Sequence, residues 1–137
     1  MPYASAQDIS DRYGADKLLL LADRNADDAA DTEVVDQALR DASAEIDTYL
    51  AAKYSMPLPS VPDALVRLCV DIAVYRLGVS ADLATEEMRQ RYEDAVALLG
   101  RISKGTASLG LPKPPSSSNG AVLVAGPKRR FGRDNLL

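Results

Sequence analysis

The most regular pattern of apolar and polar positions lies in residues 32–53. Its apolar positions recur every three or four residues, the period of an α-helix that buries one face. These positions are Val35, Leu39, Ala42, Ile46 and Tyr49. Charged side chains fall between them, on faces expected to meet solvent. At about 1.5 Å per residue, the predicted helix is roughly 33 Å long, enough to cross a small domain.

A proline-rich elbow follows this helix. Its three prolines are Pro57, Pro59 and Pro62. Each proline fixes its own φ and pushes the preceding residue toward extended geometry. We therefore expect a stiff, extended connection. A further helix is predicted over 62–77, with Pro62 in its first turn and Gly78 ending it.

The same period predicts three more helices. One short helix begins after Ser5 and ends at Gly14, a second spans 16–22, and the last spans 85–104 with Thr85 as its cap. The fold class is therefore all-α, a small bundle of about four to five helices. The side chains expected in its core are Leu39, Ile46, Tyr49, Leu65, Leu68, Ile72, Tyr92, Val96 and Leu99.

The composition changes after Gly105. Residues 111–120 are rich in proline and serine, which is typical of an extended linker. Residues 121–125 form a short apolar run of strand length, and a lone strand needs a partner on its own body or on a neighbouring chain. We therefore divide the chain into a helical domain, 1–105, and a linker with a basic C-terminal arm, 106–137.

Charge is distributed unevenly along the chain, whose net charge is −4. Residues 111–137 carry five basic side chains and one acidic one, whereas the preceding 110 residues carry 11 basic and 19 acidic side chains. An acidic body is not expected to attract nucleic acid. The basic arm is suited to an acidic partner, and another copy of the same protein offers such a surface.

The residues that usually carry chemistry are scarce. The chain has no histidine, which removes the commonest general base and metal ligand, and it has no glycine-rich phosphate-binding motif. Cys69 is the single cysteine and lies among apolar positions, so we expect a buried structural thiol. We expect no enzymatic activity, cofactor or metal.

The sequence also indicates where the protein is made. No apolar run approaches the roughly 20 residues needed to span a membrane. The first residues lack the basic and apolar regions of a secretory signal. We expect synthesis in a bacterial cytoplasm, with no membrane partner.

Several segments carry a resemblance that covers nearly the whole chain. They read YASAQDISDRYG, AEIDTYLAAKYSMPLPSVPDAL, LCVDIAVYRL, RYEDAVALLGRISKG and KRRFGRDNLL. In this order they resemble the Mu-like tailed-phage and prophage head–tail connector (adaptor) family. The resemblance implies a structural virion protein at the head–tail junction.

The family's assembly gives the expected partners. The resemblance implies a homo-oligomeric ring of about 12 copies that joins the portal vertex of the capsid to the tail, through a tail-completion or tail-tube protein. DNA would pass through the lumen without sequence-specific contacts. The arm residues expected to contact a partner are Lys128, Arg129, Arg130, Phe131 and Arg133.

An alternative function is a small helical DNA-binding or packaging-associated protein that uses its basic tail. The tail's cations could give weak, salt-sensitive and sequence-independent binding. The acidic body and the absence of a basic candidate recognition helix argue against this alternative.

Overall fold

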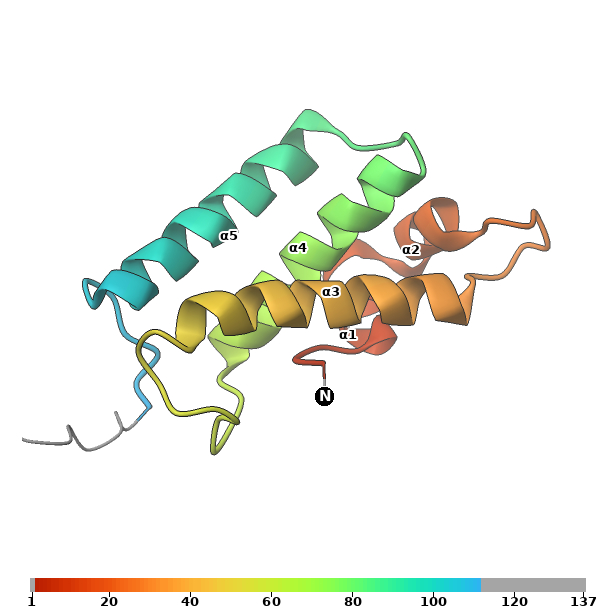
Figure 1. Cartoon of the computed structure of the whole chain (residues 1–137). Coiled ribbons are helices and arrows are strands. Elements are labelled where there is room, and N and C mark those ends of the chain that lie inside the picture. Colours follow the sequence, from red (N-terminus) through yellow and green to blue (C-terminus); the bar gives the residue numbers. More distant parts are fainter. Residues whose placement is uncertain (1, 112–137) are drawn as a thin grey trace, which may run out of the picture.

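The computed structural model describes residues 2–111, which form a bundle of helices (Figure 1). In chain order these helices are α1 (Ala6–Tyr13), α2 (Ala15–Ala22), α3 (Thr32–Leu50), α4 (Asp63–Ser80) and α5 (Glu86–Lys104). The predicted all-α fold class is confirmed. The strand considered for 121–125 lies outside the described residues.

Helix α4 forms the centre of the bundle. It packs against α3 and α5, and α1 and α2 also contact it. Its apolar residues extend around most of its circumference, so that even Val70, Ala73 and Val74 are fully buried. A helix that is apolar on nearly every side is expected to be enclosed by its neighbours, and α4 occupies that position.

The predicted core residues fall into two groups. The side chains of one group are at most 1% exposed: Leu39, Ile46, Leu65, Leu68, Ile72 and Leu99. Tyr49, Tyr92 and Val96 are only partly buried. On α3 the fully buried position near the end of the helix is Leu50, one residue beyond Tyr49.

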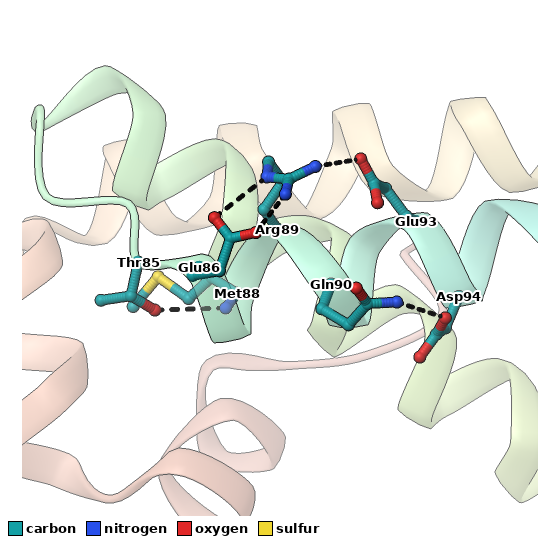
Figure 2. Close-up of polar contacts among 7 residues, drawn as sticks. All are labelled: Thr85, Glu86, Met88, Arg89, Gln90, Glu93 and Asp94. Carbon is teal, nitrogen blue, oxygen red and sulfur yellow. Dashed lines mark hydrogen bonds and ion pairs between the residues drawn. The ribbon is translucent and has the colours of Figure 1, made fainter.

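Side-chain caps begin three of the helices. Ser5 and Asp8 form a reciprocal capping box on α1, and Asp31 accepts a hydrogen bond of 3.1 Å from the backbone N–H of Glu33. At α5, Thr85 accepts a hydrogen bond of 3.1 Å from the backbone N–H of Met88 (Figure 2). Each cap satisfies a backbone donor that has no partner within its helix.

Two predicted helix ends were wrong. Helix α3 ends at Leu50 rather than at residue 53, because the chain turns there and Tyr54 donates its N–H to the Leu50 carbonyl at 2.8 Å. Helix α4 continues through Gly78 to Ser80. Gly78 is buried, and a Cβ at this position would lie 3.1 Å from the Cα of Ala84. This glycine therefore permits close packing rather than ending the helix.

The elbow lies between α3 and α4. Pro57 and Pro59 are exposed. Pro62 is the extended residue immediately before α4, with φ −65° and ψ 153°, so the prediction that it lies in the first turn was wrong. Beyond α5 the chain returns to this end of the bundle, where Leu109 donates its N–H to the Tyr54 hydroxyl at 3.1 Å. The described chain therefore ends beside the C-terminal end of α3 (Figure 1).

Within the described residues, no helix is both long enough and apolar enough to span a membrane.

Candidate functional site

The predicted partner contacts of the arm lie outside the described residues, so the site described here is on the helical body. Helices α3 and α5 converge at their C-terminal ends and diverge toward the start of α3 (Figure 1). An open groove of about 940 Å³ lies between the first half of α3, the end of α4 and Tyr92 of α5. Its volume is in the range of sites that bind partners or ligands in other proteins.

The inner part of the groove is aromatic and aliphatic. Tyr75 and Tyr92 stack with their ring centroids 4.6 Å apart and their planes 18° apart. Val34 and Val79 also line the groove, and Val79 is 55% exposed. This combination offers a partner both flat aromatic surface and exposed aliphatic surface.

A polar network below the groove fixes the tyrosine pair. Glu45 accepts a hydrogen bond of 2.9 Å from the Tyr92 hydroxyl and pairs with Arg76 at 2.5 Å. Burial and the bond to Glu45 raise the pKa of the Tyr92 phenol. The phenol therefore remains a neutral donor, and the charge of Arg76 is largely balanced by Glu45.

The outer edge of the groove is mainly acidic. It carries Glu33, Asp36 and Asp41 along one side of α3. Asp41 accepts a hydrogen bond of 2.8 Å from the Gln37 amide, whereas within residues 2–111 neither Glu33 nor Asp36 forms an ion pair. Arg40 is the basic residue on this edge, and it donates to Gln37 at 2.7 Å. Two exposed carboxylates thus remain available to a cationic partner.

A second polar cluster lies between α1, α4 and α5. Asp71 is 7% exposed, accepts a hydrogen bond of 2.8 Å from the Tyr13 hydroxyl and pairs with Arg67 at 3.6 Å. The guanidinium of Arg91 lies 5.1 Å from the centre of the Tyr13 ring. Arg12 completes the lining of this smaller hollow.

Burial governs the protonation of this cluster. It raises the pKa of Asp71, while the Tyr13 hydrogen bond and the neighbouring arginines oppose that rise. Burial and the bond to Asp71 raise the pKa of Tyr13 to about 12. The Asp71–Tyr13 pair links α1 to α4, and we assign it a structural role because both groups have partners within the bundle.

The remaining reactive side chain is Cys69. Its thiol is fully buried and lies 3.5 Å from the Ser43 hydroxyl, and burial raises its pKa. A thiol in this setting is a poor nucleophile. Within the described chain, no group of three or more cysteine or carboxylate side chains is positioned to hold a metal ion.

Known proteins match this chain over nearly the whole helical body. A family profile described as "Bacteriophage Mu, Gp36" matches residues 3–125. This chain belongs to the bacteriophage Mu Gp36 family. The Mu-like prophage FluMu protein gp36 of Haemophilus influenzae is 37% identical over 124 residues, covering 88% of this chain and 86% of the relative.

A second relative comes from the phage that gives the family its name. Gene product J of Escherichia phage Mu is 37% identical over 126 residues, covering 90% of this chain and 88% of the relative. The predicted resemblance to Mu-like phage and prophage proteins is thereby confirmed. Membership of the Mu Gp36 family supports a structural or morphogenetic role in a phage.

Sequence reasoning did not find the groove. Tyr92 was expected in the core, and no periodicity indicates that Tyr75 stacks on it or that Glu45 accepts a hydrogen bond from its hydroxyl. A weak signal was present on α3, where Glu33, Gln37 and Asp41 recur every four residues and so share one polar face.

Proposed function

We propose that this member of the Mu Gp36 family is a head–tail connector, or adaptor, that forms a ring between the portal vertex of the capsid and the tail. A ring requires two different complementary surfaces on each copy, because its contacts are head-to-tail. The observation that carries the proposal is a pair of unlike features at opposite ends of the body. The acidic groove lies toward the start of α3. The last described residues, which precede the basic arm in the sequence, lie beside the end of α3.

The arm is the proposed contact with the neighbouring copy or with the portal. Lys128, Arg129, Arg130 and Arg133 surround Phe131 in the sequence. Cations around one large apolar side chain suit a segment that anchors on an acidic surface with apolar hollows. The ring would contain about 12 copies, following the symmetry of the portal.

The first test is the mass of the full-length protein in solution. Light scattering at high concentration, alone and with the portal protein of the same phage, should give a discrete assembly of about 12 copies in at least the portal-containing sample. A chain that lacks residues 128–137 should lose this assembly. If the shortened chain still assembled on the portal and gave infectious particles, the assigned role of the arm would be wrong.

The DNA-binding alternative is tested by a mobility-shift assay over a range of salt concentrations. A connector with an acidic body should bind DNA weakly, without sequence preference, and lose that binding as salt rises. Tight, sequence-selective binding would overturn the connector assignment and favour the alternative.

A further inference from the structure

We infer that the groove between α3, α4 and α5 receives the basic C-terminal arm of a neighbouring copy, with Phe131 against the Tyr75–Tyr92 pair. This inference rests on the proposed ring function. It identifies the groove as the surface of one copy that the arm of the next copy contacts. The groove and the arm match in apolar character, in charge and in position, and each match comes from a different observation.

The apolar match concerns the inner part of the groove. The stacked rings of Tyr75 and Tyr92 lie beside Val79, whose side chain is 55% exposed. Aromatic side chains favour stacked or edge-on contact with other rings. Phe131 is the single phenylalanine of the chain, and the volume of about 940 Å³ leaves room for it together with flanking residues.

The charge match concerns the outer edge. Glu33 and Asp36 make no ion pair with any residue in 2–111, while the nearby Arg76 is already paired with Glu45 at 2.5 Å. Among the described residues, the edge therefore offers two carboxylates that have no ion-pair partner and one cation, Arg40. The arm carries four cations in 128–133 and no acidic residue before Asp134. Complementary charges of this kind steer association and fix its register.

The position of the two surfaces allows a contact between neighbouring copies. Leu109 is held at the far end of α3 by the Tyr54 hydroxyl, at 3.1 Å. Glu33 lies 17 residues before Leu50, where α3 ends, and at about 1.5 Å per residue the two ends of the helix are roughly 26 Å apart. The 16 residues of 112–127 could extend over about 50 Å. This length is enough to reach the groove of a neighbouring copy. The proposed ring selects that groove over the chain's own, because a head-to-tail contact repeated from copy to copy closes a ring.

Disulfide cross-linking between two full-length chains tests this inference. One chain carries Val79→Cys and the other, distinguished by a tag, carries Gly132→Cys. After mixing and mild oxidation, a product joining the two chains should form at least ten times more abundantly than with the control Leu20→Cys, which replaces another exposed aliphatic residue, on α2. The native Cys69 is buried and should contribute little.

The outcomes separate the inference from the ring itself. A discrete ring in light scattering with no more Val79–Gly132 product than the control gives would overturn the inference and leave the connector standing. A product formed only when both substitutions are on the same chain would place the arm on its own groove and would also overturn it. A product between chains that do not form rings, even with portal, would support the groove contact and count against the ring.

Charge reversal provides an independent readout. The double variant Glu33→Lys/Asp36→Lys should lower the yield of the cross-linked product at least five-fold. Combining it with Arg129→Glu/Arg130→Glu on the partner should restore most of the yield. The matched control is Asp63→Lys/Asp94→Lys, which makes the same change of charge at exposed helical positions outside the groove. Equal yields for both double variants would contradict the assigned edge contact.

Discussion

Replacing Gly78 with alanine tests whether this residue is required for close packing between α4 and the start of α5. A Cβ there would lie 3.1 Å from the Cα of Ala84 and 3.1 Å from the sulfur of Met88. Carbon atoms in favourable contact lie about 3.5–4.0 Å apart. Met88 is itself buried, at 3% exposure, so its sulfur cannot simply move into solvent. Relief requires the connection between α4 and α5 to shift.

Two opposing terms set the expected magnitude. Alanine is favoured over glycine inside a helix by about 1 kcal/mol. Forcing an extra methyl group into a packed core costs about 1–3 kcal/mol. The cost should exceed the gain, and we expect Gly78→Ala to lower the free energy of unfolding by about 1 kcal/mol, which corresponds to a fall of about 4 °C in Tm for a chain of this size.

Gly100 provides the matched control. It lies inside α5, and a Cβ there would meet no heavy atom within 4 Å. Gly100→Ala should therefore keep the helix-propensity gain and raise the free energy of unfolding by about 0.5–1 kcal/mol. Both variants are measured by urea unfolding, followed by circular dichroism at several protein concentrations, because assembly would add to apparent stability. If Gly78→Ala were stabilising to the same degree as Gly100→Ala, the packing explanation would be wrong.

Four further predictions concern single residues. Gly105 has φ +87° at the end of α5. Gly105→Ala should therefore lower the free energy of unfolding, measured by urea unfolding, by about 1 kcal/mol or more. Tyr13→Phe should lower the free energy of unfolding by about 1–3 kcal/mol at pH 7, because it removes the hydroxyl that donates to buried Asp71; an unchanged value would refute the structural role of this pair. Burial raises the pKa of Asp71 above 3.8, so the folded state binds this proton more readily than the unfolded chain does. The contribution of Asp71 to stability must then fall as pH rises from about 4 through the raised pKa, and Asp71→Asn should flatten that part of the pH profile. Cys69, buried and with a raised pKa, should react with a thiol reagent at pH 7 only when the chain unfolds; rapid labelling of the native protein would contradict its placement.

Features that depend on local sequence were predicted well. Ser5, Gly14 and Thr85 act within one turn of a helix end, and the structure places all three at caps. A cap is set by residues three or four positions apart, so it can be inferred without knowing what the helix packs against. The long amphipathic helix was predictable for the same reason, since its apolar face repeats over five turns.

Features that depend on packing between distant segments were not predictable. Gly78 was interpreted as a stop signal because a glycine after an apolar run usually ends a helix, and only the approach of Ala84 and Met88 shows its actual role. The groove is a stronger case. The groove exists because α3 and α5 diverge. The angle between two packed helices cannot be derived from hydrophobic periodicity alone.

Three tyrosine–carboxylate bonds give this bundle a specificity that its core cannot supply by itself. The core is almost entirely aliphatic, and aliphatic side chains tolerate many packings of similar energy. Hydrogen bonds are directional, and each of these joins segments far apart in sequence: Tyr3 with Asp47, Tyr13 with Asp71 and Tyr92 with Glu45. The first ties the N-terminal segment to α3, the second ties α1 to α4, and the third ties α5 to α3. The third also holds one ring of the groove's aromatic pair, so the network that sets the arrangement of the helices also sets the shape of the surface proposed to receive a partner.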